Sequence, residues 1–269
     1  GDNVKQLVAG EVVHGTVLSV KKHEILIDLG PLGVGLVPRR EVGFSRALNE
    51  GDDVTASIVD SELDNGYVLL SLRKAAKDKG WDEVVAKLSA VARSLKVDLP
   101  DAAGAEMGPL ATFAHRDKVA AMVEAARAAG ADILAGGARP GSQALERGAY
   151  YLPTLIGGID NHAAIAQQEI FGPVLCMIPF DDEDDLITQA NNSCFGLASG
   201  VWTRDYQRAW RVARALEAGT VWINTYKQLS IATPFGGFKD SGIGREKGVS
   251  GMRLYQQPKG IYFGMSPMA

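Results

Sequence analysis

Short apolar runs alternate with turn residues over the first eighty positions of the chain. Alternation of apolar and polar positions with this short period is typical of β-strands. The pattern predicts strands over residues 12–20, 24–29, 33–37, 54–59 and 67–72. Asp64-Asn65-Gly66 indicates a hairpin turn before the last strand, and residues 38–41 indicate a turn or short helix after the third. Together these elements predict a small, closed, all-β barrel.

The apolar spacing changes at Trp81, because apolar residues then recur every three or four positions. That period predicts a helix ending near Lys96. Residues 115–129 predict a second helix, and residues 131–134 predict a strand that follows it. Helices alternating with strands favour an α/β segment after the barrel.

The charged stretch at residues 75–80 lies between the two patterns and indicates a flexible connector. We therefore predict a first domain at residues 1–76, a junction at 77–83 and a second domain at 84–269. The change of pattern is abrupt, so the chain combines two unrelated halves.

Glycines are dense between Gly219 and Glu246, after a β-branched and aromatic strand at residues 220–223. A loop follows the strand and leads to Gly236-Gly237. Glycines at this density indicate backbone that bends tightly or approaches another group closely.

Composition limits the functional classes. Hydrophobic residues make up 46% and charged residues 22% of 269, typical of a globular protein, and no apolar run could span a bilayer. Cys176 and Cys194 fit neither a disulfide framework nor metal-ligand spacing, and the four histidines are scattered. We expect a cytoplasmic protein without a metal site. The net charge of −4 provides no global basic field for nucleic acid.

Four phrases in the first half occur in an order that resembles the S1 RNA-binding domain, a barrel of the OB type: GEVVHGTVLSV, ILIDLGPLGVGLVP, EGDDVTASIVDSE and GYVLLSLRKA. The resemblance covers about residues 10–75 and implies RNA or the ribosome as a partner. The candidate nucleic-acid-binding residues are Lys21, His23, Arg39, Tyr67 and Arg73. Residues 1–80 hold 10 Lys and Arg against 12 Asp and Glu, a net charge of −2, so docking to a protein or an inert fold stays open.

The second half resembles the C-terminal part of the catalytic domain of NAD(P)-dependent aldehyde dehydrogenases. The string W-x-N-T…P-F-G-G-x-K-x-S-G-x-G-R-E lies at residues 222–246, and E-I-F-G-P-V lies at residues 169–174. The resemblance covers about residues 81–263. It implies NAD or NADP as cofactor and a homo-oligomer, in which residues 260–263 extend a neighbour's sheet.

By the same resemblance, Glu169 would hydrogen-bond the nicotinamide ribose and Phe171 would pack beside the nicotinamide ring. A carboxylate can accept bonds from two hydroxyls at once. Leu229, Ile231 and Phe235 would line the tunnel through which an aldehyde enters.

The family's reaction also needs a cysteine nucleophile, a glutamate base and a glycine-rich cofactor loop. None of these motifs occurs among the 269 residues. Cys176 lies in the apolar run 174–178, where we expect a buried and inert thiol, and Cys194 has no base in a recognisable motif. We therefore assign no catalytic residue, and expect the chain to be inactive alone unless another chain supplies the missing half.

Two other interpretations stay open. In the first, the barrel is the working part, an RNA- or ribosome-binding module, and the second half is a scaffold or oligomerisation surface. In the second, the chain is an artificial or accidental fusion without integrated function.

Overall fold

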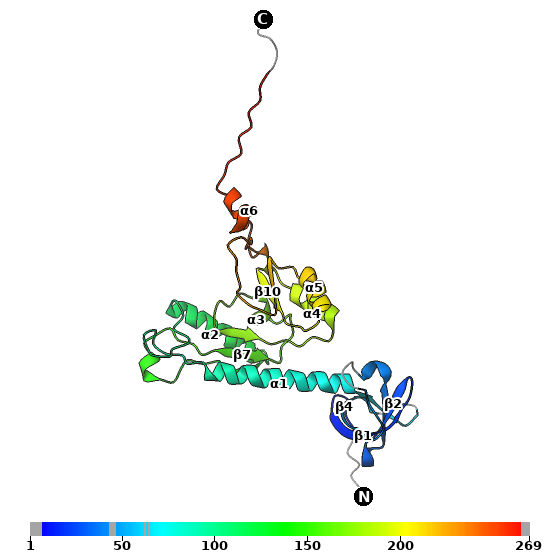
Figure 1. The fold of residues 1–269 in the computed structure, drawn as a ribbon. Coiled ribbons are helices and arrows are strands. Elements are labelled where there is room, and N and C mark those ends of the chain that lie inside the picture. The colour runs from blue at the N-terminus through cyan, green and yellow to red at the C-terminus, as the bar shows by residue number, and fades with distance from the viewer. Residues whose placement is uncertain (1–6, 43–46, 62, 64, 265–269) are drawn as a thin grey trace. The chain divides into compact units, whose positions relative to one another are not determined.

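The computed structural model describes residues 7–42, 47–61, 63 and 65–264. Figure 1 shows the order of the helices and strands along the chain. Contacts divide the chain into two compact units, residues 1–95 and residues 96–269. Asp64, part of the predicted hairpin turn, lies outside the described residues.

The first unit contains a closed five-stranded barrel with strand order β1-β2-β3-β5-β4. The strands β3 and β5 pair in parallel, and the other neighbours pair antiparallel. The closed barrel confirms the sequence prediction, and the short helix expected at residues 38–41 is present as η2. The elements are β1 (Val12–Val20), β2 (Glu24–Asp28), η1 (Gly30–Leu32), β3 (Val34–Pro38), η2 (Arg39–Glu41), β4 (Asp53–Asp60) and β5 (Val68–Ser71).

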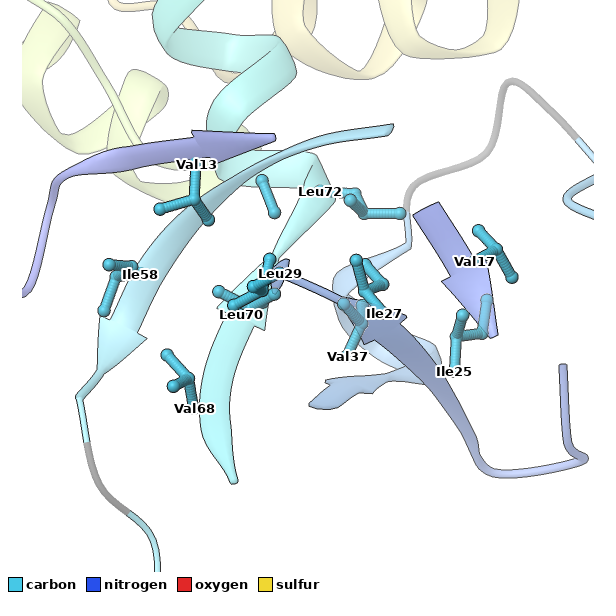
Figure 2. Close-up of a cluster of buried hydrophobic side chains, with 11 residues drawn as sticks. Val13, Val17, Ile25, Ile27, Leu29, Val37, Ile58, Val68, Leu70 and Leu72 are labelled. Carbon is cyan, nitrogen blue, oxygen red and sulfur yellow. The ribbon is translucent and has the colours of Figure 1, made fainter. Parts of the chain in front are cut away.

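The interior of the barrel is filled by alternate residues of each strand, as Figure 2 shows. Ile25 and Ile27 on β2 are completely buried, because successive side chains of a strand point to opposite faces. Glycine lets two strands approach each other where the barrel is tight. A Cβ at Gly35 would lie 2.2 Å from Cδ1 of Leu70.

A single helix, α1 (Leu72–Ser94), follows β5 directly and passes through residues 77–83, which the sequence pattern assigned to a flexible junction. The Ser71 side chain begins the helix by accepting a hydrogen bond from the Lys74 amide at 2.9 Å. Alanine and lysine favour helix strongly, and Gly80 alone opposes it. The five predicted strands form the barrel, whereas the last residues of the predicted first domain, 72–76, already belong to α1.

The second unit mixes short helices and strands in three small sheets, as expected for an α/β segment. Strands β6, β7 and β8 form one sheet, β10 and β11 form a parallel pair, and β12 and β9 form an antiparallel pair. The elements are α2 (Phe113–Ala128), β6 (Asp132–Ala135), η3 (Gln143–Leu145), β7 (Thr154–Gly157), α3 (Ala164–Gln167), β8 (Val174–Cys176), α4 (Glu183–Asn191), β9 (Phe195–Gly196), β10 (Ala198–Val201), α5 (Tyr206–Ala215), β11 (Thr220–Ile223), β12 (Phe238–Lys239) and α6 (Gly248–Arg253).

The core of the second unit lies between α2 and the β6-β7-β8 sheet. Val119 and Val123, one helical turn apart on α2, are fully buried beside Ile156 of β7. The strand predicted at residues 260–263 is not formed within the single chain, where residues 256–264 carry no helix or strand. Among the described residues, no helix is long and apolar enough to cross a membrane.

Candidate functional site

The loop between α3 and β8 carries both residues predicted to contact the cofactor. Phe171 has a φ of 58°, in the left-handed region that aromatic residues rarely adopt. Its side chain is 75% exposed, and its ring centroid lies 6.1 Å from that of His115. Unusual backbone of this kind persists where the surroundings impose it, and it concentrates at functional sites.

The loop is held by close packing at Gly172. A Cβ at Gly172 would lie 2.7 Å from a methyl group of Val119, so only glycine fits against α2. The next residue also anchors the loop, because the Thr154 amide donates to the Pro173 carbonyl at 2.8 Å. These contacts fix the loop in the position that presents Phe171 to solvent.

Glu169 lies at the edge of a cavity of about 510 Å³ that is also lined by Asn191, Ser193 and Glu217. Its side chain is exposed, and its carboxylate has no hydrogen bond or ion pair among the described residues. Lys118 donates to the backbone carbonyl of Glu169 at 3.4 Å, which leaves the carboxylate free. An open carboxylate beside a cavity can accept hydrogen bonds from a polyhydroxylated ligand.

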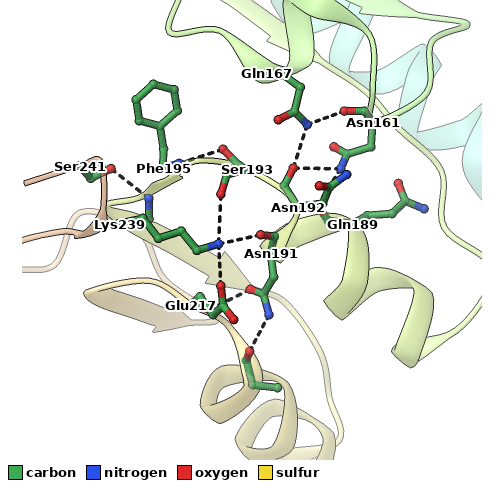
Figure 3. Close-up of polar contacts among 12 residues, drawn as sticks. Asn161, Gln167, Gln189, Asn191, Asn192, Ser193, Phe195, Glu217, Lys239 and Ser241 are labelled. Carbon is green, nitrogen blue, oxygen red and sulfur yellow. Dashed lines mark hydrogen bonds and ion pairs between the residues drawn. The ribbon is translucent and has the colours of Figure 1, made fainter.

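A lysine joins three segments around this cavity (Figure 3). The Lys239 ammonium donates to the carbonyl oxygens of Asn191 at 2.7 Å and Ser193 at 3.0 Å. It also lies 2.6 Å from a carboxylate oxygen of Glu217. The Ser241 hydroxyl accepts from the Gly196 amide at 2.9 Å, beside the lysine. The α4–β9 turn, the α5–β11 turn and β12 are thus connected by polar contacts.

The residues predicted to line the aldehyde tunnel lie elsewhere. Leu229, Ile231 and Phe235 are absent from the cavity beside Glu169, and Ile231 lines a separate groove against α6. Leu229 is 51% and Ile231 86% exposed, whereas Phe235 is half-buried under the Lys247 ammonium, 5.9 Å from the ring centroid. The structure therefore does not bring the cofactor pair and the tunnel residues into one cavity.

The two cysteines differ in their surroundings. Cys176 lies on β8, half-buried, and burial raises the pKa of its thiol above the usual value. Cys194 is exposed in the turn before β9. A raised pKa disfavours the thiolate, so the Cys176 environment suits an inert thiol. Among the described residues, no cluster of His, Cys, Asp and Glu could hold a metal ion.

The predicted nucleic-acid residues of the barrel separate into two groups. Lys21 pairs with Glu24 at 3.1 Å, and the Arg39 amide donates to the His23 carbonyl at 3.0 Å, so these residues lie at one end of the β2–β3 pair. Arg73 lies near them, because its guanidinium is 3.8 Å from the Glu41 carboxylate of η2.

Tyr67 lies at the opposite end. Gly35 pairs with Val68 in the parallel β3–β5 ladder, which places Tyr67 beside the start of β3, whereas Arg39 follows its end. The structure therefore gathers four of the five predicted residues and separates the tyrosine ring from them.

Two features were missed from the sequence. The first is Lys239, which joins the walls of the Glu169 cavity and has a φ of 50°. Its position in the glycine-dense stretch is the only indication of this role in the sequence. The second is a cleft of about 1240 Å³ beside α5, lined by Trp202, Tyr206 and Trp210. Three aromatic residues within nine positions, beginning at the end of a strand, were the available signal.

Comparison with known proteins places each half in a family. The model of the aldehyde dehydrogenase family matches residues 72–261, and the model of the S1 RNA binding domain matches residues 7–73. Betaine aldehyde dehydrogenases from Rhizobium etli and Rhizobium johnstonii are 43% and 41% identical over 187 residues, which is 70% of this chain. The chain spans 38% of the length of these curated relatives.

Solved structures give the same relationship. A double mutant of betaine aldehyde dehydrogenase from Staphylococcus aureus in complex with NAD+ is 37% identical, with a TM-score of 0.69, over 72% of this chain and 39% of that one. A mutant aldehyde dehydrogenase from Bacillus cereus is 39% identical, with a TM-score of 0.64, over 67% of this chain and 36% of that one.

Proposed function

This chain belongs to the aldehyde dehydrogenase family, and from that membership we propose that it forms the nicotinamide-ribose side of an NAD(P)-dependent site for aldehyde oxidation. The observation that carries the proposal is the exposed, unpaired carboxylate of Glu169 at the edge of a cavity. A carboxylate in that position can accept both hydroxyls of a ribose. When bound, the cofactor would supply the hydride acceptor that the oxidation requires.

Phe171 has the second role in this proposal. Its left-handed backbone and its 75% exposed ring present an apolar face next to the Glu169 loop. A flat ring in this position can pack against a nicotinamide and limit its orientation. NAD is the cofactor bound in related structures, so we propose NAD over NADP as the first cofactor to test.

The loop that carries Leu229, Ile231 and Phe235 supplies the aldehyde entrance in this proposal. Its exposed apolar side chains suit an entrance that removes water from a small aldehyde. Betaine aldehyde appears in the names of the relatives and is the first substrate to test. Trp222 donates to the Gln228 carbonyl at 2.8 Å and so fixes the beginning of the loop.

In our proposal, the nucleophile and the general base are supplied by a different chain that completes the site. The raised pKa of Cys176 supports this placement. With NAD+ and betaine aldehyde, we expect no NADH from the 269-residue chain. NADH formation that disappears in Cys176→Ser or Cys194→Ser would contradict this assignment.

For the first half, we propose an S1-type OB-fold domain at residues 1–76 that binds RNA or the ribosome, joined through residues 77–83 to the aldehyde dehydrogenase part at 84–269. The group of Lys21, His23, Arg39 and Arg73 at one end of the barrel favours this second function. The side chains of Lys21, Arg39 and Arg73, gathered at one end, can contact successive phosphates of a single strand.

Cofactor binding is tested by isothermal titration of NAD+ and NADP+ into the full chain. Glu169→Gln retains the size of the side chain and removes its charge, so we expect about tenfold weaker NAD+ binding, the usual loss for one charge-assisted hydrogen bond. Glu146→Gln is the matched control, because Glu146 is an exposed glutamate beside η3. Equal affinity of both variants, or no NAD+ binding by the chain, would contradict the proposal.

A further inference from the structure

A wide cleft lies at the carboxyl ends of the parallel strands β10 and β11, and we call it the aromatic cleft. Its volume is about 1240 Å³, and the lining includes Trp202, Arg204, Tyr206, Trp210 and Asn224. The strands β10 and β11 are connected through α5, which packs against both. In α/β folds of this kind, ligands bind in the crevice beyond the carboxyl ends of the strands.

The aromatic cleft is distinct from the Glu169 cavity. The cavity is lined by Ala198, the first residue of β10, and by Ala218, which precedes β11. The cleft is lined by Trp202, which follows β10, and by Ile223, the last residue of β11. A strand of four residues spans roughly 13 Å. The two spaces therefore lie at opposite ends of the same strand pair, and a single small ligand cannot fill both.

The walls of the aromatic cleft are held in place before any ligand binds. The Asn224 side chain accepts from the Thr203 amide and donates to the Thr203 carbonyl, both at 2.9 Å. Trp202 lies against Gly200, where a Cβ would be 2.6 Å from the indole ring. The loop after β10 is therefore attached to the end of β11, and the Trp202 ring rests on its own strand.

The exposed rings suit a flat ligand. Tyr206 and Trp210 lie one helical turn apart on the same side of α5 and are 79% and 64% exposed, and Trp202 is 64% exposed. The helix packs against the unit through the buried residues Ala209, which also borders the cleft, and Val212, whereas both rings are largely exposed and contribute little to packing within the unit. Aromatic side chains bind planar rings by stacking.

The charged residues of the lining favour an anion. The lining contains Arg204 and Arg211 and no acidic residue. Arg211 is engaged by Glu183 through two bonds of 2.9 and 3.0 Å. Arg204 has no ion pair among the residues that the structure describes, so its guanidinium is available to a carboxylate.

We propose that the aromatic cleft is a binding site for a planar aromatic carboxylate, stacked on Trp210 and Tyr206 with its carboxylate at Arg204. The proposal is independent of the cofactor site at Glu169, since it concerns other residues at the other end of the strand pair.

The test is isothermal titration calorimetry, in which 2-naphthoate is added to the full chain. We expect saturable binding that weakens about tenfold in Trp210→Leu, from the loss of one stacked ring, and several-fold in Arg204→Gln. Arg214→Gln is the matched control, because Arg214 lies on α5 and does not line the cleft. Cyclohexanecarboxylate and 2-naphthalenemethanol, which lack the flat ring and the charge respectively, should both bind more weakly than 2-naphthoate.

Several results would overturn the proposal. They are absence of 2-naphthoate binding, equal weakening by Arg204→Gln and Arg214→Gln, and unchanged binding in both Trp210→Leu and Tyr206→Leu. Self-association of the chain that Trp210→Leu abolishes would also overturn it, by showing that a second copy covers the cleft. Circular dichroism of each variant confirms folding, and the exposed positions of both rings make loss of the fold unexpected.

Discussion

Replacing Lys239 by methionine tests whether the ammonium holds the three segments around the Glu169 cavity together. Methionine keeps an unbranched chain of similar length and removes only the charge and the three donors. The substitution removes bonds of 2.7 and 3.0 Å to two backbone carbonyls and an ion pair of 2.6 Å to Glu217. The two carbonyls must then find water or stay unpaired.

The size of the effect follows from exposure. The Lys239 side chain is 27% exposed, so water can replace part of the hydrogen bonding that the ammonium provides to the two carbonyls. The Glu217 side chain is 54% exposed, so the ion pair contributes less than about 1 kcal/mol to the free energy of unfolding. Hydrogen bonds to a charged donor contribute about 1.5–3 kcal/mol when they are well buried. We therefore expect a loss of about 2 kcal/mol, which lowers Tm by about 4–8 °C in a unit of this size.

The assay is thermal unfolding followed by tryptophan fluorescence, because Trp202, Trp210 and Trp222 report on the second unit. Lys227→Met is the matched control, since Lys227 also has a left-handed backbone, with φ of 56°. Within the described part of the chain, its ammonium contacts the Tyr226 ring alone, at 5.6 Å from the centroid. That contact is exposed and contributes less than about 1 kcal/mol. Equal decreases of Tm in the two variants would refute the role assigned to the Lys239 contacts.

Three further predictions concern other parts of the chain. Gly80→Ala should stabilise the first unit by about 0.5–1 kcal/mol in urea unfolding, because Gly80 lies inside α1 with no atom near the position of a Cβ. An unchanged free energy of unfolding would indicate the flexible connector expected from the sequence. The hydrogen bond from Arg211 lowers the pKa of the Glu183 carboxyl, so the stability it provides is complete above the ordinary glutamate pKa and is lost as pH falls through the lowered one. The Tm difference between the wild type and Glu183→Gln should therefore shrink on acidification, and a difference independent of pH would contradict the assignment. Iodoacetamide should modify exposed Cys194 before Cys176, whose thiol pKa is raised by burial, and mass spectrometry showing the reverse order would be inconsistent with the structure.

The barrel strands could be predicted from the sequence because their signals are local. Alternation of apolar residues, as at Ile25 and Ile27, identifies strands without knowledge of their partners. The pairing of β3 with β5 is not local, and it is this pairing that separates Tyr67 from Arg39. The sequence could therefore predict five candidate residues and could not predict that one of them lies at the other end of the barrel.

The charge of residues 75–80 predicted a flexible connector, whereas the structure shows helix there. Residues 75–80 are charged but consist mostly of strong helix formers, and Ser71 provides the N-cap that starts the helix. In the second unit, Glu169 and Phe171 are two positions apart and lie in one loop, so their proximity follows from the sequence alone. Their separation from Leu229 and Ile231 depends on tertiary packing, which no spacing along the chain reports.

The most direct test of the central claim is saturation-transfer NMR of NAD+ with the full chain. If Glu169 and Phe171 contact the nicotinamide ribose and ring, the protons of that ribose and ring should receive more saturation than the adenine protons. Glu169→Gln should abolish this difference, and Glu146→Gln should retain it. Saturation that is equal over the whole cofactor, or a pattern unchanged in Glu169→Gln, would contradict the assignment of this loop to the cofactor.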